Sequence, residues 1–209
     1  ALMQLGSEHK PKVTIEDARL LVPRSTLRVP IPQALTGDYQ QTCVLSYLCP
    51  KGYTAFSQSL NLTQVPEKLA VGLMEHDRIQ GVADKNSFAF NDYNLKTFAV
   101  RSNGLTWPYA GGVSCDFDAK DWGQAYSTLF SELDAVAPLF DRGSYKSGYV
   151  ILGAKLRGQS RTGNVDVELE LAEAADTPLV VLVFAYLRAR FTVDKRAGFS
   201  STTDPRQLQ

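Results

Sequence analysis

The chain has 209 residues, of which 44% are hydrophobic and 21% are charged, and its 22 basic residues equal its 22 acidic residues. This length fits one large domain or two small ones, and we favour one; zero net charge gives the whole chain no electrostatic preference for nucleic acid or anionic membranes. Three cysteines, Cys43, Cys49 and Cys115, are too few for a disulfide framework, and none forms a Cys-x-x-Cys pair for a zinc knuckle. The longest apolar run, Leu179 to Leu187, is well short of the roughly 18 residues that a membrane span needs.

Residues 1–41 form an irregular segment that is interrupted by four prolines, Pro11, Pro23, Pro30 and Pro32. Each proline removes a backbone donor and favours extended structure in the residue before it. Short extended pieces fit Lys12–Ile15 and Thr26–Val29. We therefore expect residues 1–41 to be an extended N-terminal arm that lies over a partner.

The next 60 or so residues contain candidate strands. The best is Thr42–Cys49, which is rich in β-branched and aromatic residues and places every second residue on one face: Cys43, Leu45, Tyr47 and Cys49. Lys96–Arg101 also alternates, whereas Leu69–Met74 and Phe88–Phe90 are weaker candidates.

One helix is predicted over Asp121–Val136. Its apolar residues recur at steps of three and four: Trp122, Tyr126, Leu129, Phe130, Leu133, Val136 and Ala137. We expect Asp118 or Asp121 to cap its start and Pro138 to help end it.

Three strands are predicted after the helix, over Gly148–Leu156, Asn164–Leu171 and Leu179–Val193. In the second, the apolar residues Val165, Val167, Leu169 and Leu171 alternate with Asp166, Glu168 and Glu170. In the third, Leu187, Ala189 and Phe191 face one way, and Arg188, Arg190 and Thr192 the other. Many strands, one clear helix and long loops predict a β-sandwich or barrel over residues 42–196, followed by a polar tail over residues 197–209.

Five glycines recur every five residues: Gly143, Gly148, Gly153, Gly158 and Gly163. The first pair has the spacing of a phosphate-binding loop, but Tyr149 and Val150 stand where that loop needs Lys and then Ser or Thr. We interpret the series as turn and bulge glycines beside strands.

Asp116, Asp118 and Asp121 are the strongest candidate for a metal site, because clustered carboxylates bind Ca²⁺. Their spacing does not match the twelve-residue calcium loop, so helix capping is the simpler interpretation. An ion at a subunit interface is the one version of a metal site that stays open.

Three side chains are candidates for acid–base or nucleophilic chemistry: His9, His76 and Cys115. His76 could serve a Ser-His-Asp site, but no Ser lies in a Gly-x-Ser-x-Gly turn. A charged surface turn at His76 and a small buried thiol at Cys115 are the simpler interpretations.

Two further patterns have both a functional and a structural interpretation. Glu168 and Glu170 have a strand spacing of about 6.6–7 Å, which an inverting glycosidase would use, although a solvated strand face is the simpler explanation. Arg188 and Arg190 form the second pattern. They could bind nucleic acid, together with the basic residues Lys155, Arg157 and Arg161. We favour a structural role instead, in which the two arginines pair with Asp166, Glu168 and Glu170 on a neighbouring strand.

The C-terminal block resembles the jelly-roll capsid subunits of picorna-like viruses. The resemblance rests on a Tyr-Lys-Ser-Gly entry (Tyr145–Gly148), alternating strands, and a Val/Leu-rich strand that runs into Arg188–Phe191. The N-terminal arm, the isolated helix and the terminal Gln209 fit the same family, and the size is most similar to the small coat proteins of the secovirid group of plant viruses, such as waikaviruses and cheraviruses. It covers about residues 40–195.

This resemblance implies a mainly β, jelly-roll β-sandwich with one or two short helices. It implies a structural protein, not an enzyme, that assembles in the host cytoplasm with other coat subunits into an icosahedral virion around an RNA genome, with RNA on the inner face and no membrane partner. It implies no catalytic, cofactor-binding or metal-binding residue. The ends, Ala1-Leu2-Met3 and Gln207-Leu208-Gln209, fit either a product cut from a polyprotein after Gln or an expression boundary.

Two rival functions are left open. A lectin-like module would bind glycans through exposed loop aromatics such as Trp107, Tyr109 and Trp122. An enzyme on the same fold would need a metal, because the chain offers few acid–base groups.

Overall fold

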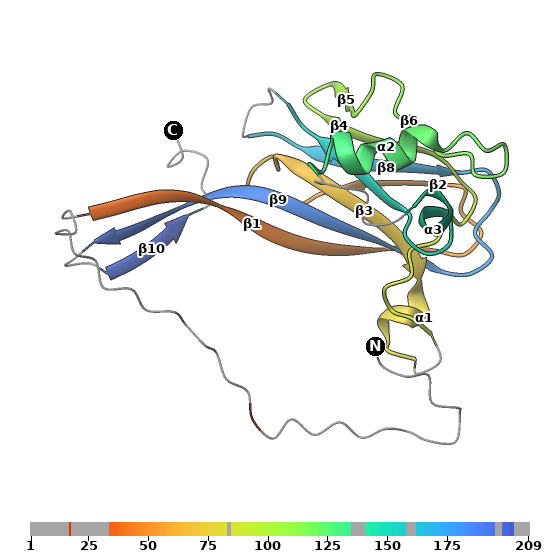
Figure 1. The fold of residues 1–209 in the computed structure, drawn as a ribbon, viewed down its shortest axis with the longest axis horizontal. Coiled ribbons are helices and arrows are strands. Elements are labelled where there is room, and N and C mark those ends of the chain that lie inside the picture. Colours follow the sequence, from red (N-terminus) through yellow and green to blue (C-terminus); the bar gives the residue numbers. More distant parts are fainter. Residues whose placement is uncertain are drawn as a thin grey trace.

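The computed structural model describes residues 17, 34–82, 85–134, 141–157, 162–194 and 198–202. Two antiparallel sheets face each other (Figure 1). The first sheet contains, in spatial order, β1 (Ala34–Cys49), β9 (Leu179–Asp194), β3 (Lys68–Glu75) and β7 (Ile151–Lys155), with β10 (Gly198–Thr202) also beside β9. The second contains β2 (Ala55–Ser59), β8 (Val165–Leu171), β4 (Leu95–Ser102) and β5 (Leu105–Trp107), with β6 (Val113–Ser114) also beside β4.

The strand pairing has a simple rule: the chain is folded back on itself and then rolled up. The first long strand pairs with the last, β1 with β9; the next pairs inward are β2 with β8 and β3 with β7. At the centre, β4 pairs with β5 and β6, which together take the place of one strand. This order defines the jelly roll, a double-sheet fold of eight strands built from two Greek keys. The predicted fold class is therefore confirmed.

The core lies between the two sheets, where alternate residues of each strand point inward. Val71 and Val183 from the first sheet, and Phe98 and Val167 from the second, are fully buried. The alternation predicted for Asn164–Leu171 is confirmed, because all four of its apolar residues are buried and belong to this core.

The predicted strands are found with shifted ends, and one weak candidate fails. Phe88–Phe90 is not a strand; Phe90 forms only an isolated bridge with Tyr149. The strand predicted from Thr42 begins at Ala34, inside the segment assigned to the arm, and the segment assigned to a polar tail contains β10. The extended pieces predicted in the arm lie outside the described residues.

The predicted helix is shorter than expected. Helix α2 spans Gly123–Ser131, and its N-cap, Trp122, receives no side-chain capping bond, so the predicted cap at Asp118 or Asp121 is wrong. Asp121 instead accepts a hydrogen bond from Ser114 Oγ (2.8 Å). Pro138 lies outside the described residues. The helix lies between β6 and β7, and four strands follow it: β7, β8 and β9, which the jelly roll requires, and the short additional strand β10.

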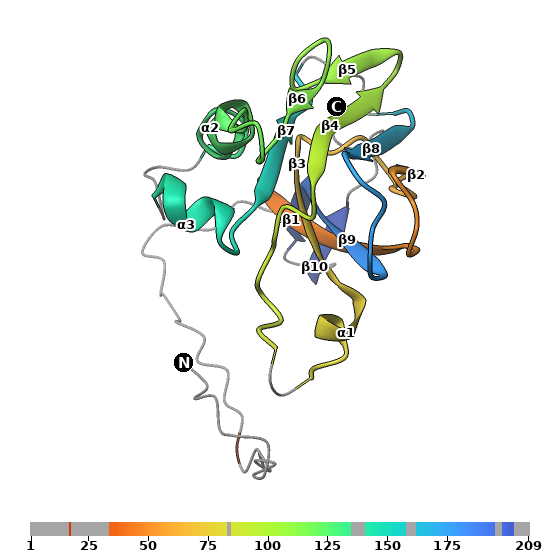
Figure 2. The ribbon, with the colours of Figure 1, turned by 90° about the vertical axis from the view of Figure 1, so that its right-hand side faces the viewer.

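Two further helices are short: α1 (His76–Ile79) follows β3, and α3 (Arg142–Lys146) precedes β7. Figure 2 shows α2 and α3 on the flank of the sandwich beside β7. In the described part of the chain, no helix has the length and apolarity to span a membrane.

Candidate assembly surfaces

The candidate nucleophile and base are not brought into a catalytic arrangement. Cys115 is fully buried, and burial, with a smaller contribution from the charge of Asp121, raises the pKa of its thiol to about 12. A thiol with that pKa is almost entirely protonated at neutral pH and is a poor nucleophile. His76 is exposed on α1, where its Nε2 lies 3.3 Å from Gln80 Nε2. His9 lies outside the described residues.

The acidic cluster closes a turn. Asp116 and Asp121 form an isolated β-bridge, and Asp116 Oδ1 accepts the backbone N–H of Ala119 (2.8 Å). In the described ranges, no group of three or more His, Cys, Asp or Glu side chains is arranged to hold a metal ion.

The two glutamates of β8 are each paired with a base from β4. Arg101 Nε lies 2.9 Å from Glu168, and Lys96 Nζ lies 3.4 Å from Glu170. These are exposed cross-strand ion pairs, which are common on the solvent-facing side of a sheet. The arrangement favours the structural interpretation over a glycosidase pair.

The predicted partners of Arg188 and Arg190 are wrong. Both arginines donate to the carboxylate of Asp38 on β1, Arg190 Nε at 3.0 Å from Oδ1 and Arg188 to Oδ2. These hydrogen bonds lower the pKa of Asp38 below its ordinary value. The sequence suggested β8 as the partner strand because it precedes β9 in the chain, but in a rolled fold consecutive strands lie in different sheets.

The aromatic residues proposed for glycan stacking are not presented together as loop platforms. Trp107 lies opposite Val100 and packs against the main core, and its buried Nε1 has no hydrogen-bond partner in the described part of the chain. Trp122 also packs against the core and stacks on Phe117 at 5.7 Å. Only Tyr109 of the three is exposed.

The glycine series serves packing and turns where it is described. A Cβ at Gly153 would lie 2.7 Å from the carbonyl oxygen of Thr128, so glycine is what lets α2 approach β7 this closely. Gly148 and Gly163 have positive φ, Gly143 is in α3, and Gly158 lies outside the described residues. The prediction of turn and bulge glycines beside strands fits Gly148 and Gly163, whereas Gly143 lies within a helix and Gly153 within β7, where it serves packing.

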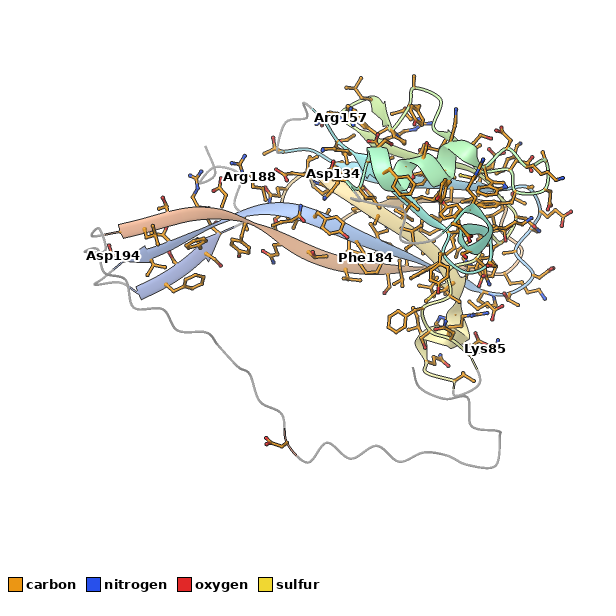
Figure 3. The ribbon with its side chains drawn as sticks, in the orientation of Figure 1. Lys85, Asp134, Arg157, Phe184, Arg188 and Asp194 are labelled. Atoms are coloured by element: carbon orange, nitrogen blue, oxygen red, sulfur yellow. The ribbon has the colours of Figure 1, made fainter. Side chains whose placement is uncertain are left out.

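The sheet edges differ in how they are protected. The N–H groups of Gly153 and Lys155 on the β7 edge donate to side chains of and beside α2, Thr128 Oγ1 at 2.9 Å and Glu132 Oε2 at 3.1 Å. The salt bridge from Lys155 to Asp134 lies on the same flank (Figure 3). At the other edges, β2, β5, β6 and β10 have five residues or fewer. Short or covered edges are how folded proteins avoid unwanted strand pairing.

Among the described residues, nothing covers the outer edge of β1, and this edge is not short. Tyr186 accepts a backbone hydrogen bond from Glu67, on the side of β9 away from β1. Backbone groups alternate sides along an antiparallel strand, and Cys43 lies opposite Ala185, so odd-numbered β1 residues bond β9. The even-numbered residues, Val44 among them, therefore present their N–H and C=O groups to the outside. Sixteen residues without proline, lysine or arginine make this edge about 50 Å long.

An apolar surface adjoins this edge on the outer face of the first sheet. Val44 and Leu48 are 56% and 55% exposed, although both lie within a regular strand. Val44 lies opposite Phe184 on β9, which Figure 3 labels, and Leu48 lies opposite Val180. Exposed apolar side chains beside open backbone groups are typical of a surface that binds another chain.

The first sheet also continues beyond the sandwich. Residues 34–40 of β1, residues 188–194 of β9 and all of β10 form a three-stranded extension that projects away from the second sheet (Figure 1). One face of it is apolar. Its members are Leu35, Tyr39, Phe191, Val193 and Phe199, which we call the extension face; four of them are exposed and Phe191 is half-buried.

Sequence reasoning missed both surfaces for different reasons. Val44 and Leu48 fall on the face opposite to the one that the alternation of Thr42–Cys49 marks as core. Phe199 was the one available signal in the C-terminal segment, as an isolated aromatic residue in polar sequence. The start of β1 was assigned to the arm because Pro30 and Pro32 lie just before it.

The strand order defines the fold class, a single jelly roll in which the long strands β1 and β9 pair with each other. Two solved structures are similar to this chain: the crystal structure of the mavirus major capsid protein (13% identity, TM-score 0.45) and the 3.5 Å cryo-EM structure of the Sputnik virophage (15% identity, TM-score 0.45). Each match covers 86% of this chain but only 44% and 41% of the respective partner, so the chain spans less than half of their length. No family model and no curated protein matches the sequence.

Proposed function

We propose that this chain is a structural capsid protein, which assembles with other coat subunits into an icosahedral shell. The observation that carries the proposal is the β1 edge. Every other edge of the two described sheets is short or covered by α2, whereas this one is long, regular and bordered by exposed Val44 and Leu48. A fold that protects all its edges except one has a specific place for a neighbouring subunit.

The charges of the chain support close packing of many copies. The net charge is zero, so like subunits repel one another little. The single charged residue in β1, Asp38, is neutralised by Arg188 and Arg190 of its own chain. A shell then gains its stability from many modest contacts related by symmetry.

Four finer parts of the proposal rest on the sequence resemblance. They are membership of the picorna-like plant viruses, a shell of several different subunits, an RNA genome within it and assembly in the host cytoplasm. The division into an arm (1–41), a sandwich (42–196) and a tail (197–209) rests on the sequence pattern, and we propose it with β1, from Ala34, and β10, up to Thr202, counted with the sandwich and its extension. Polyprotein processing of the ends is proposed on the resemblance. A non-enzymatic role fits the buried Cys115 and the paired Glu168 and Glu170.

Sedimentation and negative-stain electron microscopy test the proposal on the full-length chain, expressed alone and with the other coat proteins of its source. We expect fast-sedimenting spherical particles that contain this chain. The variant Val44→Lys places a charge on the open edge, where lysine blocks strand pairing, and it should reduce the particle yield at least about tenfold.

Val82→Lys is the matched control, because Val82 is also exposed (39%) but follows α1 and β3, and β3 lies on the opposite side of β9 from β1. It should leave the particle yield unchanged. A uniform slow peak near 23.0 kDa under every condition would refute the capsid proposal. Particles that tolerate Val44→Lys would refute the role of the β1 edge.

A further inference from the structure

The extension face is a continuation of the core-facing side of the first sheet. In β9, Val183, Ala185, Leu187 and Ala189 point to the same side and are buried. Phe191 and Val193 follow with the same period of two, but the second sheet does not reach them (Figure 1). The extension therefore has the inner face of a sandwich without the opposing sheet, and an apolar sheet face is stable only when another element covers it.

The aromatic side chains on this face are already ordered into a row across three strands. Phe191 lies flat over Gly37, where an added Cβ would be only 2.6 Å from its ring. Tyr39 lies on one side of Phe191 and Phe199 on the other, each with a ring-centroid distance of 6.4 Å. Rigid aromatic groups that need little further ordering are the residue type that dominates binding energy at interfaces.

The opposite face of the extension is polar and charged. Asp38, Arg188 and Arg190 lie on it and form one ion-pair cluster (Figure 3 labels Arg188). Ser200 and Thr202 continue this face on β10. The extension thus separates its polar side chains from its apolar ones, as a surface strand does when one of its faces is buried.

We propose that the extension face packs against the same face of a second copy of this chain, about a two-fold axis, so that each copy supplies the missing opposing sheet of the other. The extension face carries no charged side chain, so two identical copies meet without like-charge repulsion. The extension consists of β9 with β1 on one side and β10 on the other, and no other described strand lies beside it there. A two-fold contact uses the same patch on both partners, which a flat apolar face allows. The inference rests on the proposed shell role, which supplies many copies at high local concentration.

Analytical ultracentrifugation of the full-length chain over a range of concentrations tests the proposal. We expect a reversible monomer–dimer equilibrium. Phe199→Glu, which puts a charge at a residue that is 69% exposed, should weaken the dimer at least about 30-fold, because the same residue is changed in both copies. Ser200→Glu is the matched control: it is the next residue, is exposed on the polar face, and should leave the dissociation constant within about twofold.

Three outcomes would overturn the inference. One is a dimer that tolerates Phe199→Glu. Another is a monomer at all concentrations whose extension amides exchange rapidly with solvent. The third is a monomer with slowly exchanging extension amides, which would show that a segment of the same chain covers the face. Particle imaging separates this inference from the capsid proposal. If Phe199→Glu still forms particles, only the extension contact is refuted. If the chain forms a dimer that depends on Phe199 but never forms particles, only the capsid role is refuted.

Discussion

The sandwich and the extension are built from the same two strands, yet they bury their side chains to different extents. Along β9, residues of one parity are buried from Leu179 to Ala189 and then become half-exposed at Phe191 and exposed at Val193. Neither the alternation nor the residue type changes at that point; only the opposing sheet ends. Burial in a sheet protein is therefore a property of the layer that faces a strand, and an alternating strand that outruns its partner layer marks an interface.

The largest expected effect separates two phenylalanines, one in each region. Phe98 is fully buried between the sheets, so Phe98→Ala should lower the free energy of unfolding by about 3–5 kcal/mol through lost burial and a cavity. Phe199→Ala, on the extension face, should change the stability of the monomer by no more than about 0.5 kcal/mol. Urea denaturation at low protein concentration measures both.

The control for this comparison is to repeat the denaturation of both variants at several protein concentrations. If the extension face is covered by a second copy, Phe199→Ala should become destabilising as the protein concentration rises, because dimer formation stabilises the folded state. The cost of Phe98→Ala should not depend on concentration. Equal costs for the two variants in the dilute monomer would show that Phe199 is already buried by its own chain.

A second comparison concerns two glycines that lie under a close neighbour. A Cβ at Gly153 would meet the Thr128 carbonyl oxygen at 2.7 Å and a Leu133 side-chain carbon at 2.8 Å, so Gly153→Ala must displace α2 and should cost about 1–3 kcal/mol. At Gly37 the nearest atoms are the far end of the half-buried Phe191 ring, which can shift at a lower cost than backbone can. Gly37→Ala should therefore cost less than about 0.5 kcal/mol.

Thermal unfolding followed by circular dichroism distinguishes the two glycine variants. Near-ultraviolet signals from Phe191 and Tyr39 should change in Gly37→Ala, since the ring has to leave its position. A Gly153→Ala variant with unchanged stability would mean that α2 does not hold the position over β7 that the hydrogen bonds from Gly153 N–H to Thr128 and from Lys155 N–H to Glu132 indicate.

The sequence predicts the sandwich much better than the extension, and the physical reason is locality. The alternation of Asn164–Leu171 is a local pattern, and it places four residues in the core correctly. The pairing of Asp38 with Arg188 and Arg190 joins residues 150 and 152 positions apart, which only the rolled topology brings together. Alternation alone separates Val44 from Cys49, but only the folded structure shows that the side of Val44 is left 56% exposed.

The helix illustrates the same limit at its start. Aspartates just before an apolar periodic run are a reasonable prediction of a cap. Asp121, however, has a competing partner in Ser114 Oγ, on strand β6. The local periodicity predicts where the helix lies. Its expected cap, Asp121, bonds to a residue on another element instead of capping the helix.

The smallest expected effect is electrostatic and lies on the polar face of the extension. Hydrogen bonds from Arg188 and Arg190 lower the pKa of Asp38 below its ordinary value of 3.8. A carboxylate whose pKa is lower in the folded than in the unfolded state stabilises the fold above the unfolded pKa, and this contribution is lost as the pH falls through the folded pKa. Asp38→Asn should therefore lower the melting temperature slightly at pH 7, and this effect should disappear as the pH falls through the lowered pKa of the folded state. Because the pair is solvent-exposed, the difference at pH 7 should also shrink at high salt. A melting-temperature difference that does not shrink as the pH falls below the ordinary carboxyl range, or that is insensitive to salt, would mean that Asp38 acts by packing and not by charge, and the extension would then owe its shape to its apolar face alone.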